Sequence, residues 1–285
     1  MTDEFTRKNW ISQLNLDGNL FSFDTSCFDY QQESGDIFIV SYPRCGQTWS
    51  RYMLWTLLAN DGQPMSKDDN ISHVVPSFEH VGSSGSKAAP QPRILATHLM
   101  LNMLPYSHDA KYLLLTRNPK DVQVSYFYHN QGLGWVKDTE YQKHFEHFLN
   151  GKLLFGSYFE HQSSYLPFLD RRNVKLVFYE QLRGQTADQL REIAEFLEKK
   201  IPEETIQRTV LTTSLDEMQI DQQRFMSRET FEKRSQNPDA VSFVRKGEVG
   251  GWKDKMSYEQ SLAIDKKYRE CFSRTAAEHW FDDYM

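Results

Sequence analysis

The chain has 285 residues, of which 39% are hydrophobic and 14% aromatic, so it can bury a large core. A formal charge of −6 and a pI near 5.9 argue against an extended nucleic-acid surface. The first residues lack an apolar signal segment, and no apolar run approaches the ~18 residues of a membrane span. The three cysteines are too few for a disulfide framework. We therefore expect a cytoplasmic protein that binds neither nucleic acid nor membrane.

The segment after the polar residues 1–35 reads as a strand, a turn and a helix. Residues 37–40 form a short β-rich apolar run, Gly46 interrupts it, and a helix is expected from Thr48 onward. Free backbone N–H groups at the start of a helix, together with its dipole, favour an anion, and Arg44 adds a positive charge. This pattern predicts a phosphate cradle, and an ordinary strand-to-helix turn is the alternative. Residues 1–35 are expected to wrap around the domain.

Residues 61–92 are rich in Gly, Ser, Pro, Lys and Asp around a small apolar island at residues 74–78. A segment of this length without clear periodicity is typical of a functional loop. We interpret it as a substrate gate in which Phe78 forms an apolar wall. A disordered surface insertion is the alternative.

Alternating strands and helices follow along the chain. Strands are expected at residues 93–97, 110–116 and 174–179, and helices begin near Pro119 and Thr186, among other places. This order predicts an α/β fold: a single domain over residues 1–285 with a doubly wound, mostly parallel sheet. Ligands are expected at the carboxyl ends of its strands.

Two further segments carry cations suited to an anion. Arg117 ends a predicted strand and Ser125 lies eight residues later on the following helix, and Arg245, Lys246 and Gly247 begin a glycine-rich loop. Each segment alone is commonly a surface ion pair or a solvated turn. Three such segments in a chain of charge −6 favour convergence on one ligand.

Histidines supply the candidates for acid–base chemistry. His98 follows the strand at residues 93–97, so it is expected at the ligand edge of the sheet, where an imidazole suits removal of a hydroxyl proton. A core histidine is the alternative. His144 and His147 could suggest a metal pair, but no third ligand accompanies them, so we read them as a solvated helix face and predict no metal.

The cradle is not the nucleoside triphosphate loop, because Gly46 is followed by Gln47 and not by lysine. Residues 42–49 resemble the loop Tyr-Pro-Lys-Ser-Gly-Thr-Thr-Trp of the cytosolic sulfotransferases. Residues 117–125 resemble that family's Arg-Asn-x-Lys-Asp-x-x-x-Ser, residues 245–253 its Arg-Lys-Gly-x-x-Gly-Asp-Trp-Lys, and His98 lies in a Lys-Thr-His-Leu-like segment. The chain departs from the family at Arg44, Cys45, Gln47, Ala96 and Gly251.

The resemblance implies a sulfotransferase that moves a sulfuryl group from 3′-phosphoadenosine 5′-phosphosulfate (PAPS) to a hydroxyl or amine of a small organic acceptor and releases the bisphosphate PAP. It implies that His98 is the catalytic base, that Arg44 contacts the leaving oxygen and that Ser125 completes the site. The donor-binding residues that it implies are Arg44, Cys45, Gly46, Gln47, Thr48, Trp49, Arg117, Ser125, Tyr179, Thr213, Leu215, Arg245, Lys246 and Gly247, with the loop 241–256 closing over the nucleotide.

Several properties stay open in the sequence. Phe78, Tyr126, Trp135 and Phe225 are weak candidates for the acceptor pocket. A homodimer is doubtful because the family's dimer pattern is degraded at residues 253–262. A nucleotide-binding sensor or scaffold with little turnover is the alternative function, and a nucleoside kinase is a third. Cys45 beside Arg44 is either a readily ionised thiol or a stand-in for serine.

Overall fold

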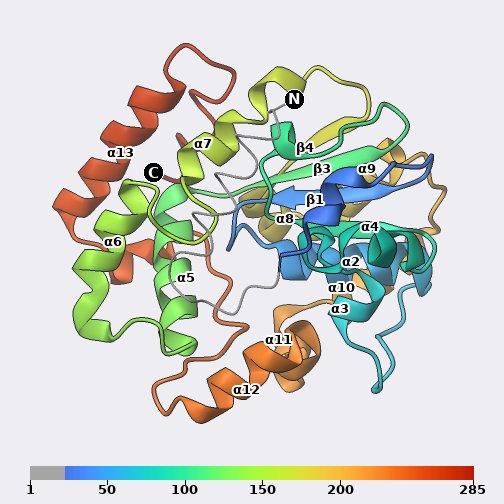
Figure 1. Cartoon of the computed structure of the whole chain (residues 1–285), viewed down its shortest axis with the longest axis horizontal. Coiled ribbons are helices and arrows are strands. Elements are labelled where there is room, and N and C mark those ends of the chain that lie inside the picture. Colours follow the sequence, from blue (N-terminus) through green and yellow to red (C-terminus); the bar gives the residue numbers. More distant parts are fainter. Residues whose placement is uncertain (1–22) are drawn as a thin grey trace.

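The computed structural model describes residues 23–285, so residues 1–22 of the expected wrapping segment lie outside it (Figure 1). Its centre is a parallel sheet of four strands in the order β2-β1-β3-β4. The strands are β1 (Ile37–Ser41), β2 (Ile94–Thr97), β3 (Lys111–Thr116) and β4 (Val174–Phe178). The predicted α/β fold is confirmed, and each strand lies within about a residue of its predicted position.

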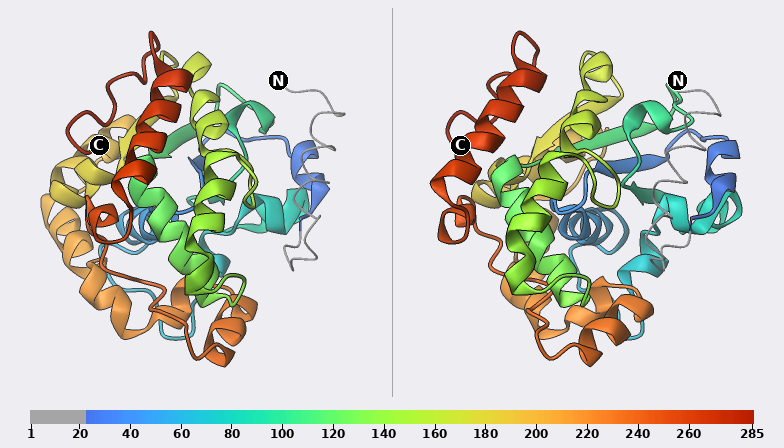
Figure 2. Two further views of the ribbon diagram at one scale, coloured as in Figure 1. Left: turned by 90° about the vertical axis from the view of Figure 1, so that its left-hand side faces the viewer. Right: turned by 60° about the vertical axis from the view of Figure 1, so that its left-hand side comes forward.

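Both faces of the sheet are covered, which explains why β1 and β3 are largely apolar along their length. Along β1, Ile37 and Ile39 belong to one buried cluster, whereas Phe38 and Val40 belong to a second. Alternate residues of a strand point to opposite faces, so the two clusters are the cores on the two sides of the sheet. Figures 1 and 2 show helices on both sides of the strands, as a doubly wound sheet requires.

The helices that position the site begin directly after strands. The helix α2 (Gln47–Ala59) follows β1, α5 (Pro119–Gly132) follows β3, and α8 (Tyr179–Gly184) follows β4. Asn118 caps α5, since its side-chain oxygen accepts the N–H of Lys120 at 2.9 Å. The other α-helices are α3 (Ile71–Val74), α4 (Phe78–Ala88), α6 (Tyr141–Leu149), α7 (Tyr158–Ser163), α9 (Thr186–Phe196), α10 (Glu203–Thr212), α11 (Leu215–Ile220), α12 (Arg228–Gln236) and α13 (Tyr258–Phe272).

Short 3-10 turns complete the structure, and the carboxyl-terminal part of the chain closes one side of it. The turns are η1 (Thr25–Asp29), η2 (Leu101–Met103), η3 (Asp138–Glu140), η4 (Leu166–Phe168), η5 (Gln222–Phe225) and η6 (Gly251–Asp254). The helix α13 packs against α5, α6 and α7. In Figures 1 and 2, α11 and α12 lie together at one end of the molecule, beyond the sheet.

Residues 61–92 correct the sequence-based expectation of an irregular loop, because they contain α3 and α4. The helix α4 is kinked at Gly82, whose φ of +62° is a conformation that glycine adopts without strain. Its first residue, Phe78, is fully buried against Phe38 and Tyr30 in the second core. The glycines and serines of this segment indicated a loop, but tertiary packing stabilises short helices there.

His144 also differs from its expected environment. It was read as part of a solvated helix face, but its side chain is buried, and Asn130 lies within 3.2 Å of its Nε2. Within residues 23–285, no group of three or more His, Cys, Asp or Glu side chains has an arrangement that could hold a metal ion. Over the same residues, no helix combines the length and apolar character needed to cross a lipid bilayer.

Candidate functional site

A cavity of about 560 Å³ lies at the carboxyl ends of the strands. Segments that are far apart in the sequence meet there, namely the β1–α2 turn, the end of β2, α5, the start of α8 and residues 243–255. Most of the predicted site residues line this cavity: Arg44, Gly46, Gln47, Thr48, Trp49, His98, Arg117, Ser125, Tyr126, Trp135, Tyr179, Leu215, Phe225, Arg245, Lys246 and Gly247.

The β1–α2 turn forms a concave set of donors. Gly46 has φ +91° and Arg44 has φ +72°, so two left-handed residues bend the chain before α2 begins. The backbone N–H groups of residues 46–49 hydrogen-bond no carbonyl or side chain within the described part of the chain. They are free donors at a helix N-terminus, where its dipole also favours an anion.

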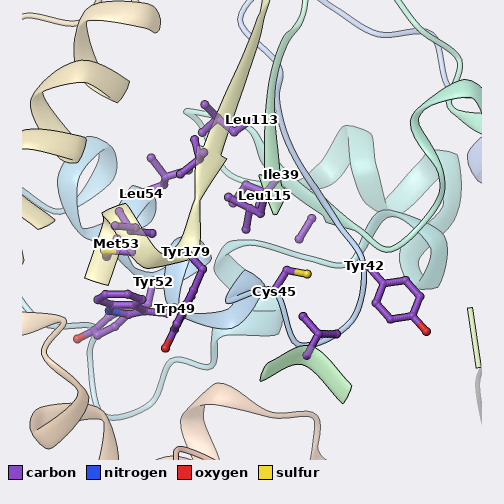
Figure 3. Close-up of a cluster of buried hydrophobic side chains, with 14 of the residues drawn as sticks. Ile39, Tyr42, Cys45, Trp49, Tyr52, Met53, Leu54, Leu113, Leu115 and Tyr179 are labelled. Carbon is purple, nitrogen blue, oxygen red and sulfur yellow. The ribbon is translucent and has the colours of Figure 1, made fainter. Parts of the chain in front are cut away.

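Gly46 is required for space as well as for its backbone conformation. A Cβ at this position would lie 2.7 Å from Cδ2 of Tyr179. The rings of Trp49 and Tyr179 are 5.9 Å apart in an edge-to-face arrangement, and Figure 3 shows them close together beneath the strands. The indole N–H of Trp49 donates to the carbonyl of Thr213 at 2.7 Å, which fixes the ring.

The arginines of all three cationic segments face the cavity. Arg117 donates from Nη1 to the carbonyl of Arg44 at 3.1 Å and from Nη2 to the carbonyl of Glu248 at 3.2 Å. Its guanidinium lies 4.1 Å from the ring centroid of Tyr179, and its Nε is buried without a partner among the described residues. Arg245 stacks similarly, 4.0 Å from the ring centroid of Tyr128.

Positive charge accumulates here, although the carboxylates of Asp121 and Glu248 lie near Arg245. Burial, followed by the charges of Arg117, Arg234 and Arg245, lowers the pKa of Arg44 to about 10. Within residues 23–285, none of Arg44, Arg117 and Arg245 forms an ion pair with a carboxylate. A cavity with several arginines and free N–H donors fits a ligand with several negative charges.

The carboxylate of Asp121 holds the loop that follows Arg245. It accepts the N–H of Gly250 at 2.8 Å and that of Trp252 at 2.9 Å. The neighbouring Lys120 is buried, pairs with Asp265 at 2.6 Å and lies 4.5 Å from the ring centroid of Trp252. The first turn of α5 therefore fixes part of the segment 241–256, which the family resemblance predicts to be the closing loop over the nucleotide.

His98 occupies the cavity edge that its position after β2 predicted. Its Nδ1 lies 2.8 Å from the carbonyl oxygen of Ser41, and its backbone N–H donates to the Oε1 of Glu79 at 3.0 Å. Burial lowers the pKa of the imidazole, the neighbouring charge of Glu79 opposes that shift, and the imidazole is neutral near pH 7 as a result. A carbonyl only accepts, so Nδ1 carries the proton and Nε2 keeps its lone pair.

The walls beyond His98 are mostly apolar and aromatic. Phe155 packs against the imidazole with ring centroids 5.0 Å apart, and it holds a φ of +70°, an unusual conformation for a bulky residue. Tyr126 donates from its hydroxyl to the carbonyl of Leu154 at 2.7 Å. Trp135 and Phe225 complete this side, whose further apolar members are Leu133, Leu154, Met218, Met226 and Phe243.

Three predicted site residues do not line the cavity. Phe78 lies in the second core, and Thr213 is buried, where it contributes through its bond to Trp49. Cys45 is 1% exposed, and Figure 3 shows its sulfur among buried apolar side chains. Burial raises the pKa of its thiol, so the hypothesis of a readily ionised cysteine is wrong.

Sequence reasoning missed several residues that line the cavity or contact His98. Tyr128, which stacks on Arg245, lies three residues after Ser125 and could have been found by helical spacing on α5. His129 lies 3.4 Å from Arg44, Nδ1 to Nη1. Glu79 and Phe155 could not have been found, because neither belongs to a motif and only the tertiary fold brings them to His98.

Comparisons with known proteins identify the family of the chain. Residues 34–276 match the family described as Sulfotransferase domain. The human Sulfotransferase 1C2 is 30% identical over 257 residues, covering 87% of this chain and 86% of the relative. The chimpanzee (Pan troglodytes) Sulfotransferase 6B1 is 32% identical over 257 residues, covering 87% and 79%. The chain therefore belongs to the sulfotransferase family and is an enzyme of that family.

Solved structures show the same fold. A mouse sulfotransferase, SULT7A1, complexed with PAP superposes with a TM-score of 0.73 at 23% identity, covering 91% of this chain and 92% of that chain. Retinol dehydratase in a complex with retinol and PAP superposes with a TM-score of 0.74 at 22% identity, covering 94% and 87%. The resemblance to cytosolic sulfotransferases in the motifs thus extends to the architecture of nearly the whole chain.

Proposed function

We propose that this enzyme transfers the sulfuryl group of PAPS to a hydroxyl or amine of a small organic acceptor and releases PAP. The supporting observation is that Arg44, Arg117 and Arg245, from three distant segments, share one cavity with His98. The buried and unpartnered Nε of Arg117 adds a donor that a phosphate oxygen would satisfy.

The donor would occupy the cationic half of the cavity. The free N–H groups of residues 46–49 would bind the 5′-phosphosulfate, and Arg117, Ser125 and Arg245 the 3′-phosphate. The adenine would lie against aromatic rings. The other contacts carried over from the family are those of Lys246, Gly247, Leu215, Trp49 and Tyr179, with Thr213 acting through Trp49 and Cys45 through its backbone.

The reaction is an in-line displacement at sulfur, in which positioning and charge stabilisation dominate. Nε2 of His98 accepts the proton of the acceptor hydroxyl, the acceptor oxygen forms a bond to sulfur, and the bond from sulfur to the phosphate oxygen breaks. The guanidinium of Arg44 stabilises the charge that develops on this leaving oxygen. The positive charge of Arg44 is enough to stabilise the leaving oxygen without donating a proton, because the leaving phosphate is a weak base.

The acceptor half favours a molecule with an apolar body. Trp135, Phe155 and Phe225 supply rings, whereas Ser72 and His80 bring polar atoms from the segment 61–92. That segment also contacts His98 through Glu79, which supports a role in covering the acceptor.

The gate, the single domain, the cytoplasmic location and the homodimer remain predictions.

A transfer assay tests this proposal. Radiolabelled PAPS is offered with a panel of phenols, alcohols and amines, and we expect labelled product with at least one acceptor. His98→Gln should lower the rate by roughly 10²-fold or more, because it removes the general base. His279→Gln, at an exposed histidine, is the matched control. Tight PAP binding without transfer to any acceptor would instead support the sensor or scaffold.

Nucleotide specificity gives a second test. PAP should raise the melting temperature of the protein, because it binds the folded state only. ATP should have little effect, because its triphosphate does not match two separated phosphate sites. A larger shift with ATP than with PAP would favour the nucleoside kinase over the sulfotransferase reaction.

A further inference from the structure

The side chain of Gln47 connects the ends of two strands beside His98. Its Nε2 donates to the carbonyl of Thr97 at 2.8 Å and to the hydroxyl oxygen of Ser41 at 3.0 Å, and it lies 3.3 Å from Nδ1 of His98. The amide is 7% exposed, so water does not compete effectively for these bonds. Gln47 is the first residue of α2, and thus three elements meet at one amide.

The hydrogen-bonded pairing of β1 with β2 ends next to the side-chain amide of Gln47. The last pair between β1 and β2 is Val40 with Thr97, whereas Ser41 pairs only with Leu115 of β3. Ser41 and His98 therefore lie one residue beyond the hydrogen bonds that join β1 to β2. The bonds of Gln47 to Thr97 and Ser41 span this gap, and no ladder bond replaces them.

The partners of each group show which atoms of Gln47 and His98 donate hydrogen bonds. The carbonyl of Thr97 only accepts, so the group of Gln47 that faces it is the NH₂ group. Its two hydrogens are used by Thr97 and Ser41, so its approach to Nδ1 of His98 is a contact and not a third bond. Nδ1 in turn donates to the carbonyl of Ser41. Gln47 thus holds the residue whose carbonyl selects the tautomer of His98.

The other contacts of His98 hold different parts of it. Glu79 accepts its backbone N–H, His161 lies 3.2 Å from its carbonyl oxygen, and Phe155 packs against its ring. Within residues 23–285, Nε2 hydrogen-bonds no protein group. The direction in which this nitrogen points therefore depends on the Ser41 contact at the opposite side of the ring.

We propose that Gln47 is a positioning residue for the reaction: it ties the ends of β1 and β2 together and so keeps His98 as the Nδ1–H tautomer with Nε2 available to the acceptor. This inference rests on the proposed role of His98 as base. Gln47 replaces the threonine of the family loop, and a threonine side chain has no amide with which to reach both strand ends.

Charges near the imidazole define how a substitution should change its titration. Burial has the largest effect on His98 and lowers its pKa. The carboxylate of Glu79 opposes this shift, whereas the positive charge of Arg51 adds to it. The charged and titratable groups that face it come from α2, α4, α5 and α7, namely Arg51, Glu79, His80, His129 and His161. A carboxylate at position 47 would lie close to Nδ1 and stabilise the imidazolium.

Two variants separate these effects in the full-length protein. Gln47→Met keeps the length of the side chain and removes its hydrogen bonds, so kcat should fall roughly 10-fold to 100-fold through misplacement of the base, with PAP affinity nearly unchanged. Gln47→Glu should move the acid limb of the kcat/KM profile to higher pH. Ser50→Ala, one turn further along α2 at a hydroxyl without a partner among the described residues, should change neither.

A readout without turnover separates this inference from the proposed function. Nitrogen chemical shifts of labelled histidine, measured with PAP bound, report the tautomer of His98. The wild type should show the Nδ1–H form, and Gln47→Met should populate the other tautomer. An unchanged tautomer and kcat in the folded Met variant would overturn the inference, as would a loss of PAP affinity at constant kcat, which would place Gln47 in donor binding. A missing transfer activity would instead contradict the proposed function.

Discussion

Nε of Arg44 donates to the hydroxyl of Ser125 over 3.1 Å, a contact between residues 81 positions apart in the sequence. Arg44 follows β1 and Ser125 lies in α5, so this bond joins the strand-to-helix turn to the second cationic segment. It uses one donor of the guanidinium and leaves the terminal nitrogens for other partners. The bond therefore aims the positive charge of Arg44 at the cavity.

We expect Arg44→Lys to retain most of the turnover, because the leaving oxygen requires a positive charge and lysine provides one. Arg44→Ala should lower kcat on the order of 10²-fold or more. Steady-state rates with saturating PAPS measure both effects. Arg228→Ala, at a side chain that is 92% exposed, controls for loss of an arginine elsewhere. Full activity of the Ala variant at position 44 would contradict the role of this cation.

The two bonds of Asp121 to the closing loop predict a separate effect on donor affinity. Asp121→Ala should raise the KM for PAPS about 10-fold, since charge-assisted hydrogen bonds are lost, while kcat changes much less. Asp188→Ala is the control, because that carboxylate is exposed and pairs with Arg191, away from the cavity. If both variants alter kcat and leave the KM for PAPS constant, the loop does not depend on Asp121.

Gly46→Ala should weaken PAP binding and destabilise the fold. The positive φ costs a non-glycine residue roughly 1–2 kcal/mol, and the new Cβ would collide with Tyr179. Thermal melts with and without PAP measure the two effects. Gly184→Ala is the comparison, because its added Cβ meets no atom within 4 Å and its φ is not positive. Equal melting temperatures for both variants would show that the turn tolerates a side chain.

Buried histidines predict a loss of stability in acid. Burial lowers the pKa of His144 to about 4 and that of His161 to about 3, whereas the ordinary value is 6.5. The unfolded chain therefore binds protons first, and the free energy of unfolding should fall as the pH drops below 6.5 toward these lower values. Each histidine contributes at most about 1.4 kcal/mol per pH unit.

Urea unfolding at pH 7, 6 and 5 measures this dependence. His144→Gln should make the dependence of stability on pH less steep, because it removes one group that takes up a proton on unfolding. His279→Gln, at an exposed residue, should leave the slope unchanged. A slope that is the same in all three proteins would mean that His144 does not titrate on unfolding.

The sheet and the cradle could be predicted because their signals are local. Apolar runs identified the strands at residues 37–40 and 110–116, an alternating pattern identified the strand at residues 174–179, and the order of Arg44, Gly46 and Thr48 identified a strand-to-helix turn. His98 and Arg117 were assigned to one site by the rule that ligands lie at the carboxyl ends of parallel strands, and Arg245 by the expected convergence of three cationic segments on one ligand. The structure brings these three residues to the same cavity.

The remaining features depend on contacts that no local pattern contains. The helix α4 is rich in Gly and Ser and packs on η1 and β2, whereas α3 packs on α2 and η5. Phe78 was placed in the acceptor pocket because it is aromatic, but its packing against Phe38 puts it in the core. Cys45 adjoins a cationic residue in sequence, yet its sulfur points into apolar surroundings. The direction in which a side chain points depends on the tertiary fold, so the local sequence does not reveal it.

The guanidinium groups of Arg117, Arg234 and Arg245 each lower the pKa of Arg44, so the free enzyme carries electrostatic repulsion at this site, which the carboxylates of Asp121 and Glu248 near Arg245 reduce. A bound polyanion removes that repulsion. The free energy released contributes to ligand affinity and raises the free energy of unfolding of the protein. The proposed donor would thus act as a structural component as well as a reactant. In a cell, the amount of intact enzyme should follow the supply of activated sulfate, because a population starved of it unfolds and is degraded sooner.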